Sequence, residues 1–400
     1  MEFDETQQAM EEVIRDFCRR EIEPCIPELE SGKVSPFELM RKMSDALDME
    51  GLITSGALAD PAVPAILAKE IARVSPGLCL SVVSNLGCGA TILSRGSEAL
   101  IKRCAIPVLS LKKVGCWALT EPESGSDAFA LKTTARIEGD EVVLNGSKAF
   151  SSNAPAADVL LIYARLAGGE KGDKRRIYPV VIERDTPGLE TGPPLEKFGM
   201  HASPTGDIFL DDVRVPRENL LGDPDRPARA TAEQTLSSER IIIVAMCLGV
   251  IERCLDEAIA HATQRIQFGK PIAAFQLTQQ KLARMYVAQE NVRNSMFELI
   301  RAQLAGDVSE RQVSAAKWYA TEAAADAALD AMQIMGGAGY LREHAPERLF
   351  RDIKLWTIGG GSSEIQQLTI AKDLLRQKGF AIDLAGGFQI DGPKPSPDDS

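Results

Sequence analysis

The sequence predicts a mostly helical α+β fold with its strands in the middle of the chain. Apolar residues follow a helical spacing through residues 1–110. Short runs rich in β-branched residues come next, and long segments with few prolines or glycines follow Pro227. The chain has 400 residues, more than one typical hydrophobic core organises, so two or three packed units are expected. The expected order is therefore helices, then strands, then helices.

Residues 1–112 are predicted to form an N-terminal helical domain. One apolar stripe with the spacing i, i+3, i+4 and i+7 consists of Met10, Val13, Ile14 and Phe17. This spacing places all four side chains on one face of a helix, which is then expected to face the core. Further helices are predicted near residues 37–50 and 62–75, and between Asn85 and Ile106.

Residues 113–222 are predicted to form a middle β domain. Two runs rich in β-branched residues flank Glu138, Gly139 and Asp140, which is a hairpin signal. Short apolar or alternating runs predict further strands at residues 159–166, 176–183 and 206–216. Proline and glycine interrupt the connections from residue 186 to residue 224, as expected for turns between strands.

Residues 223–379 are predicted to form a C-terminal helical bundle. Long segments with helical periodicity are found at residues 230–262, 270–304 and 308–336. Helices of this length that follow one another with short connections pack as an antiparallel bundle. The last segment, residues 380–400, ends in a run of Pro, Asp, Lys and Ser and is predicted to be a disordered tail.

The composition is that of a soluble protein, and it excludes several function classes. A net charge of −12 argues against general nucleic-acid binding, which needs basic patches. Eight scattered cysteines without a CxxC pair and three separated histidines make a metal site unexpected. Reduced thiols, an acidic N-terminus without the features of a signal peptide, and no long apolar run predict a cytoplasmic protein without an integral membrane segment.

Two motifs lie in the predicted β domain. Residues 116–130, CWALTEPESGSDAFA, are rich in turns and combine backbone N–H groups with the hydroxyls of Thr120, Ser124 and Ser126. Such a segment either contacts the polar edge of a ligand ring or is an ordinary surface loop. Residues 145–153, NGSKAFSSN, contain Phe150, which is either a flat apolar surface for a ligand or a core residue of a strand.

Two further motifs lie in the predicted bundle. In residues 265–276, RIQFGKPIAAFQ, the Arg265 guanidinium is either a bidentate phosphate ligand or an exposed side chain without a role. Residues 333–366 contain glycines that permit helix-ending turns and close approach of the backbone to an anionic cofactor. The fingerprint GxGxxG of the Rossmann fold is absent.

In order and spacing these segments resemble the motifs of the FAD-dependent acyl-CoA dehydrogenases over residues 5–375. The matching residues are Thr120, Glu121, Pro122, Gly125, Ser126, Asp127, Lys148, Phe150, Ser152, Asn153, Arg265, Phe268, Gln276, Gln333, Gly336, Gly337, Gly339, Tyr340, Glu343, Arg348, Arg351 and Asp352. The resemblance implies a helical N-terminal domain, a β-barrel middle domain, a C-terminal four-helix bundle and an FAD cofactor. Arg348, Arg351 and Asp352 also fit a purely structural ion-pair network.

The resemblance also implies roles for individual residues. Cofactor contacts are implied for Leu119, Thr120, Phe150, Ser152, Arg265, Phe268, Gln276, Gln333, Gly336, Gly337, Ser362 and Glu364. Substrate contacts are implied for Ser126, Arg240 and Gly360. In the family, the residues equivalent to Arg265 and Phe268 reach the FAD of a neighbouring subunit, so an assembly of subunits is implied.

The residue that serves as the base in most of this family is missing from its usual place. Residues 357–366, TIGGGSSEIQ, resemble the flavin-facing loop, but Gly360 occupies the position of the usual glutamate. Glu239, directly before Arg240, resembles the alternative base of isovaleryl-CoA and long-chain acyl-CoA dehydrogenases. The arrangement also resembles that of crotonobetainyl-CoA reductases, with a Gly-Gly-Ser loop and a Glu-Arg pair on the helix. The other reading of Glu239 is a surface ion pair with Arg240 or another neighbour.

The resemblance implies FAD-dependent α,β-dehydrogenation of an acyl-CoA. Glu239 would remove the α-proton, hydride would pass from Cβ to flavin N5, and electrons would continue to an electron-transfer flavoprotein. A homotetramer, built as a dimer of dimers, is expected. Two alternatives stay open: an enoyl-CoA reductase running in reverse, and a non-catalytic partner subunit of a homologous dehydrogenase. The acyl group, and whether the thioester is on CoA or on a carrier protein, are not determined.

Overall fold

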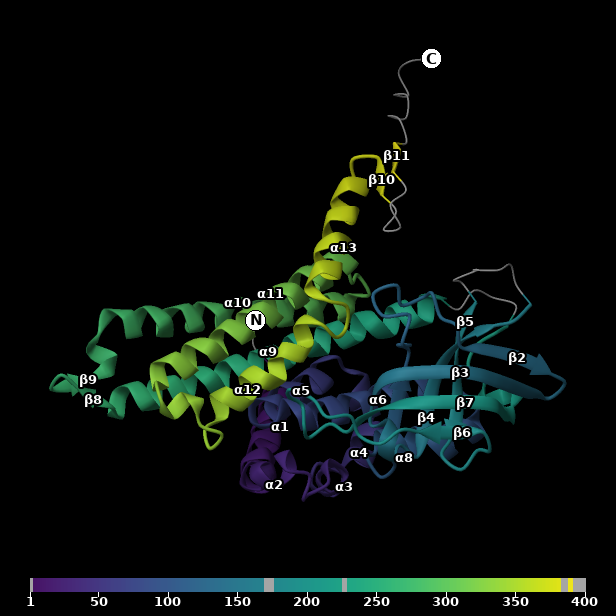
Figure 1. Cartoon of the computed structure of the whole chain (residues 1–400), viewed down its shortest axis with the longest axis horizontal. Helices are drawn as coiled ribbons and strands as arrows, with labels where there is room; N and C mark the ends of the chain where they lie inside the picture. Colours follow the sequence, from purple (N-terminus) through teal and green to yellow (C-terminus); the bar gives the residue numbers. More distant parts are fainter. Residues whose placement is uncertain (1–2, 169–175, 225–228, 383–387, 391–400) are drawn as a thin grey trace, which may run out of the picture.

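The computed structural model describes residues 3–168, 176–224, 229–382 and 388–390. Figure 1 shows N-terminal helices beside a sheet, with long C-terminal helices lying across both. This is the expected order of helices, strands and helices. Apolar side chains from all three parts contribute to one large core cluster, while a smaller one lies between helix α6 (Pro76–Arg95) and the sheet.

The N-terminal helices begin and end at recognisable signals. Besides α6 they are α1 (Glu5–Phe17), α2 (Ile26–Glu30), α3 (Pro36–Ala46), α4 (Met49–Thr54), α5 (Ala62–Val74), α7 (Glu98–Leu100) and α8 (Ile106–Leu109). Asp4 and Gln7 form a reciprocal capping box at the start of α1. Ser75 ends α5, and its side chain accepts from the backbone N–H of Leu78 at the start of α6.

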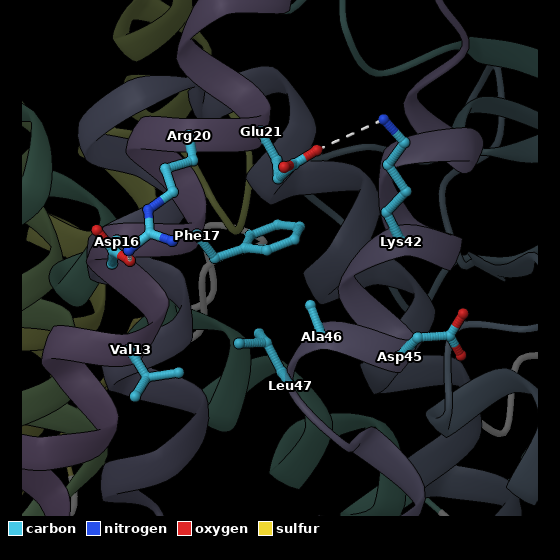
Figure 2. Close-up of a pocket in the computed structure, with 9 residues that line it drawn as sticks. All are labelled: Val13, Asp16, Phe17, Arg20, Glu21, Lys42, Asp45, Ala46 and Leu47. Carbon is cyan, nitrogen blue, oxygen red and sulfur yellow. Dashed lines mark ion pairs between the residues drawn. The ribbon is translucent and has the colours of Figure 1, made fainter.

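The predicted apolar stripe of α1 is only partly buried. Ile14 and Phe17 are in the core, whereas Val13 is 56% exposed. Val13 instead lines a groove of about 610 Å³ between α1 and α3 (Figure 2). A pair of Glu21 and Lys42, 3.5 Å apart, lies at its rim. The lining residues include none of the motif residues, so this groove is not the candidate site.

Helix α6 continues through Gly87 and Gly89 without interruption. Its length and composition meet the criterion for a helix that crosses a membrane, although the sequence was not expected to contain such a run. In the structure, 61% of the relevant window is buried inside the protein. The close approach of Leu109 to Gly89 shows why a small residue is present there: a Cβ at this position would lie 2.7 Å from Leu109 Cγ.

The middle part is one curled sheet of seven strands. They are β1 (Gly115–Ala118), β2 (Thr134–Glu138), β3 (Glu141–Ser152), β4 (Val159–Leu166), β5 (Ile177–Glu183), β6 (Leu189–Thr191) and β7 (Thr205–Pro216). The order is β1-β4-β2-β3-β7-β6, with β5 on the other side of β4. The predicted hairpin is confirmed: β2 pairs with β3 up to Glu138 opposite Glu141, and Gly139 adopts a φ of 62° in the turn.

The C-terminal part is built on three long helices, α9 (Arg229–Gln264), α10 (Gln276–Ala305) and α11 (Glu310–Met335). The shorter α12 (Ala345–Ile353) and α13 (Ser363–Arg376) pack against α11. Helix α10 begins six residues later than predicted. Residues 270–275 instead form β9 (Lys270–Pro271), which pairs with β8 (Ile266–Gln267), and a single 3₁₀ turn. Pro271 favours extended backbone at the residue before it, which is consistent with this difference.

Helix α13 projects away from the rest of the molecule in Figure 1. Beyond it, β10 (Phe380–Ile382) pairs with β11 (Phe388–Ile390) in a short antiparallel hairpin. The sequence predicts disorder here, so the structure differs at these six residues, whose Phe-Ala-Ile and Phe-Gln-Ile sequences favour strands. The remainder of the predicted tail lies outside the described residues.

Candidate active site

A buried ion pair joins the first two motifs. The Lys148 ammonium on β3 lies 2.8 Å from Glu121 Oε1 and donates to the Leu119 carbonyl at 3.0 Å. Glu121 also accepts from the backbone N–H groups of Lys132 and Thr133, at 2.6 and 3.0 Å. Burial lowers the pKa of Lys148 to about 8 although Glu121 opposes the shift. Burial would raise the pKa of Glu121, but Lys148 and the hydrogen bonds outweigh it and the net pKa is lowered.

This ion pair holds the first motif, residues 116–130, next to strand β3, which contains most of the second motif. The Ala149 N–H donates to the Thr120 carbonyl at 2.9 Å, so partly buried Thr120 lies beside the residue that precedes Phe150. Ser152, also partly buried, pairs with Thr205 on β7. Leu119 is buried in the core, and Ser126 is exposed in the loop that follows.

Phe150 is not a core residue. Its side chain is 68% exposed, and its φ of 54° lies in the left-handed region that non-glycine residues rarely adopt. Strand β3 has a register irregularity at this point, between Lys148 and Ser151. Such a backbone costs roughly 1–3 kcal/mol and is found mainly at functional sites. The structure therefore favours the ligand-facing reading of Phe150 over the core reading.

Arg240, in the first third of α9, contacts the glycine loop (residues 356–361), and Glu239 directly precedes it in the helix. Arg240 is 8% exposed, and its Nε donates to the Gly360 carbonyl at 3.1 Å. Glu239 is partly buried, and among the described residues no hydrogen bond or ion pair engages its carboxylate. Arg240 instead lies 3.8 Å from Glu310. The reading of Glu239 as a surface ion pair is therefore not supported by the described residues.

The surroundings of Glu239 make it a stronger base than an exposed glutamate. Burial raises the pKa of its carboxyl, and the positive charges of Arg240 and Lys317 oppose this without cancelling it. A carboxylate with a raised pKa accepts a proton more readily at neutral pH. The helix that contacts the glycine loop thus carries a carboxylate that has no hydrogen-bond or ion-pair partner among the described residues.

Two further side chains, on α11 and α13, hold the glycine loop, and no sequence motif contains a role for them. Lys317 on α11, fully buried, donates from Nζ to the carbonyls of Trp356 and Gly361 at 2.6 and 2.7 Å. Gln366 on α13 donates from Nε2 to the carbonyls of Gly360 and Gly361 at 3.1 and 2.9 Å. A signal was present for Lys317, because this lysine interrupts an alanine-rich stripe that otherwise faces the core.

Gly360 cannot carry a side chain in this arrangement without strain. Its φ is 63°, and a Cβ would lie 2.7 Å from Cδ1 of Ile243, one turn after Glu239 on α9. The space and the backbone conformation at residue 360 are therefore both adapted to glycine.

We expect Gly360→Ala to destabilise the protein by about 1.5–3.5 kcal/mol. Left-handed backbone costs a non-glycine residue roughly 1–2 kcal/mol. Moving the flexible end of Ile243 out of a favoured rotamer adds roughly 0.5–1.5 kcal/mol. Urea unfolding measures the change in the free energy of unfolding. Gly359→Ala is the matched control, because the nearest atom to its Cβ would be 3.5 Å away. Ile243→Val removes Cδ1, so Gly360→Ala should cost less in the Ile243→Val background than in wild type. Equal stability of the two alanine variants would contradict the steric account.

A second group of predicted cofactor ligands lies at the other end of the bundle. Arg265, Phe268 and Gln276 are all exposed, with Phe268 93% exposed at the tip between β8 and β9. The α-helical rise of about 1.5 Å per residue puts them roughly 38 Å from Glu239 along α9. Gln333, Gly336 and Gly337, exposed at the end of α11, belong to this same end, because α9 and α11 run in the same direction. One chain therefore does not bring the two sets of predicted ligands together.

The remaining predicted residues have structural partners. Ser362 caps α13 by accepting from the Ile365 N–H at 3.4 Å, and its hydroxyl is the largest cause that lowers the pKa of exposed Glu364. Arg351 pairs with Glu347 at 2.9 Å and lies 3.7 Å from Glu30. These contacts agree with the reading of Arg351 as part of a structural ion-pair network that ties α12 to the N-terminal helices.

Comparison with known proteins agrees with this geometry. Three family models match: acyl-CoA dehydrogenase N-terminal domain at residues 4–112, middle domain at residues 116–213 and C-terminal domain at residues 229–375. The chain is 35% identical to the 3-(aryl)acrylate reductase of Clostridium sporogenes, over 94% of this chain and 100% of that protein.

Two solved structures have a similar fold. Butyryl-CoA dehydrogenase from Megasphaera elsdenii matches with a TM-score of 0.87 and 30% identity, over 94% of this chain and 100% of that one. A glutaryl-CoA dehydrogenase from Mycobacterium smegmatis in complex with FADH2 matches with a TM-score of 0.86 and 26% identity, over 93% and 95%. On these matches, the chain belongs to the acyl-CoA dehydrogenase family and is an oxidoreductase.

Proposed function

We propose that this chain is an FAD-dependent enzyme that dehydrogenates an acyl-CoA between Cα and Cβ, with Glu239 as the base. The observation that carries the proposal is the partly buried Glu239 carboxylate, which has no partner among the described residues. It lies on the helix that meets a glycine loop without a carboxylate of its own. The thioester carbonyl makes the α C–H acidic, and Glu239 accepts that proton. The raised pKa of Glu239 favours this transfer at neutral pH.

The other residues of the site position the reacting groups. Arg240 and Gln366 both donate to the Gly360 carbonyl, so the loop that faces the thioester is fixed relative to the helix that carries the base. Ser126, exposed in the turn that Glu121 anchors, is proposed to contact the thioester. Helix α9 carries both Glu239 and Arg240, so the hydrogen bond of Arg240 to the Gly360 carbonyl also fixes the helix of the base relative to the loop.

The described residues fit a flavin dinucleotide at two places. Near the base, the exposed Phe150 ring offers a flat apolar surface, with Leu119, Thr120 and Ser152 alongside. FAD, when bound there, supplies the ring system that accepts the hydride. At the other end of the bundle, the exposed Arg265 and Phe268 offer a phosphate ligand and an aromatic ring.

One cofactor molecule cannot contact both places within one chain, because they lie roughly 38 Å apart along α9. We therefore propose that FAD binds between subunits of a homotetramer, with Arg265, Phe268, Gln276, Gln333, Gly336 and Gly337 acting on the cofactor of a neighbouring chain. Large exposed apolar residues on α10, α11 and α13 support an interface: Leu277, Tyr286, Val287, Leu329, Leu368 and Leu374. An electron-transfer flavoprotein as acceptor and a cytoplasmic location with reduced thiols complete the proposal.

Reduction of an enoyl thioester is the second candidate function. It is favoured by the similarity to a protein named 3-(aryl)acrylate reductase. The same residues serve both directions, since Glu239 would then donate the proton to Cα. The two functions differ only in which half-reaction the enzyme supports.

Anaerobic flavin absorbance near ~450 nm distinguishes the candidates, because the colour of the cofactor reports its redox state. Purified holoenzyme is mixed with saturated acyl-CoAs, and chemically reduced holoenzyme is mixed with the matching enoyl-CoAs. Bleaching by an acyl-CoA is the result expected for a dehydrogenase. Return of colour with enoyl-CoAs alone would establish a reductase. Loss of both reactions, or a protein without flavin, would contradict the proposal and favour a non-catalytic partner subunit.

A further inference from the structure

Lys317 is a fully buried charge for which the proposed reaction has no use. Its side chain extends from α11 to the glycine loop, where Nζ donates to the carbonyls of Trp356 and Gly361. An ammonium group brought out of water carries a substantial desolvation cost unless it is paired. Neither of its two hydrogen-bond partners is charged, so hydrogen bonding alone does not explain why the group is an ammonium.

A neutral side chain already provides the same kind of contact. Gln366 donates to the carbonyls of Gly360 and Gly361 without a charge. With Arg240 on the Gly360 carbonyl, side chains from α9, α11 and α13 hold the loop from three directions. This matters because Gly360 and Gly361 have φ values of 63° and 87°, a conformation that glycine adopts without strong preference and leaves readily.

The proposed base is among the groups whose charge acts on Lys317. The charged and titratable groups around Lys317 are Glu239, Arg240 and Cys247 on α9 and Glu364 on α13. Those around Glu239 are Arg240 on its own helix and Lys317 from α11. Burial lowers the pKa of Lys317 to about 8, with Glu239 among the groups that oppose the shift, so the ammonium form prevails at neutral pH.

We propose that Lys317 is a positioning residue with two linked effects: it fixes the carbonyls of the glycine loop, and it places a buried positive charge in the site that contains Glu239. The second effect rests on the proposed function of Glu239 as the base. Lys317 touches neither thioester nor cofactor in this proposal. It acts through the loop and through the carboxylate, and it keeps Glu239 ready to accept a proton although burial of that carboxylate opposes ionisation.

Lys317→Met tests both effects in the holoenzyme, because methionine has a similar length without charge or N–H donors. Hydrogen–deuterium exchange should become faster in the segment spanning residues 354–362. The value of kcat should fall by about 10- to 100-fold, as expected when a reacting group is misplaced. Since the ammonium lowers the pKa of Glu239, its loss should move the acid limb of the kcat profile to higher pH. Lys354→Met, which removes an exposed lysine of the same segment, should match wild type in all three measurements.

Lys317→Gln separates the charge from the hydrogen bonds, because the amide keeps N–H donors. Its exchange should be closer to wild type than that of Lys317→Met, while its acid limb should move as in Lys317→Met. Unchanged exchange in Lys317→Met would overturn the positioning role. An acid limb that stays at the wild-type pH in both variants would overturn the role of the charge. Exchange is measured without thioester, so it decides the positioning role independently. Failure of wild type to react with any thioester contradicts the proposed function instead.

Discussion

Glu239→Gln is expected to slow flavin reduction by an acyl-CoA by about 10²–10⁴-fold, the usual contribution of a positioned general base. Glutamine has nearly the same shape but cannot accept the α-proton. Stopped-flow bleaching under saturating substrate measures the effect. The fold should not suffer, because no described residue forms a hydrogen bond or ion pair with the carboxylate.

The same variant should be at least as stable as wild type, with a difference that depends on pH. The folded-state pKa of Glu239 is raised, so the folded protein holds this proton more tightly than the unfolded chain does. Its stabilising effect is present below the unfolded pKa and is lost as pH rises through the folded pKa. Thermal unfolding should therefore show an advantage of Glu239→Gln over wild type that grows from acidic to neutral pH.

Glu310→Gln is the matched control for both measurements. Glu310 is an exposed carboxylate 3.8 Å from Arg240, so its replacement removes a charge near the site without touching the proposed base. It should bleach at nearly the wild-type rate. If Glu239→Gln bleached as fast as this control, Glu239 would not be the base.

Lys148→Met is expected to destabilise the protein by about 3–5 kcal/mol, because it leaves the buried Glu121 carboxylate without its charged partner. Lys148 is fully buried and Glu121 is 5% exposed, so solvent screens little of this interaction. Loss of the bond to the Leu119 carbonyl should also loosen the turn that carries Thr120 and Ser126. Urea unfolding followed by circular dichroism measures the change in the free energy of unfolding.

Two further variants test whether the effect comes from the unpaired buried charge. Lys148→Met combined with Glu121→Gln leaves no lone buried charge, so it should be less destabilised than Lys148→Met alone. Lys132→Met removes the exposed partner of Glu123 and should change stability by less than about 1 kcal/mol. A Lys148→Met variant as stable as Lys132→Met would show that the pair is not needed to hold the turn.

Local sequence determined the elements and their order. The β2–β3 turn at Gly139 and the strands at residues 159–166 and 206–216 came from short-range patterns of apolar, β-branched and turn residues. The motifs also predicted the family, which the family models confirm, and drew attention to Gly360 and Glu239. The structure differs from the prediction in two places. Residues 270–271 form a strand of a short hairpin where a helix was expected, and short strands occur in the segment predicted to be disordered.

Tertiary structure alone decided how the site is assembled. Arg240 and Gly360 are 120 residues apart in the chain, and Lys317 and Gly361 are 44 apart, so no local pattern encodes their hydrogen bonds. The exposure of Phe150 likewise depends on which elements pack against β3. Local periodicity reflects the preferences of a segment for helix or strand, whereas burial, charge pairing and the steric limit at Gly360 arise only when distant segments share the same space. The sequence therefore predicted the family and the candidate base. The fold placed the helix that carries this base against the glycine loop and brought Lys317 to the same loop.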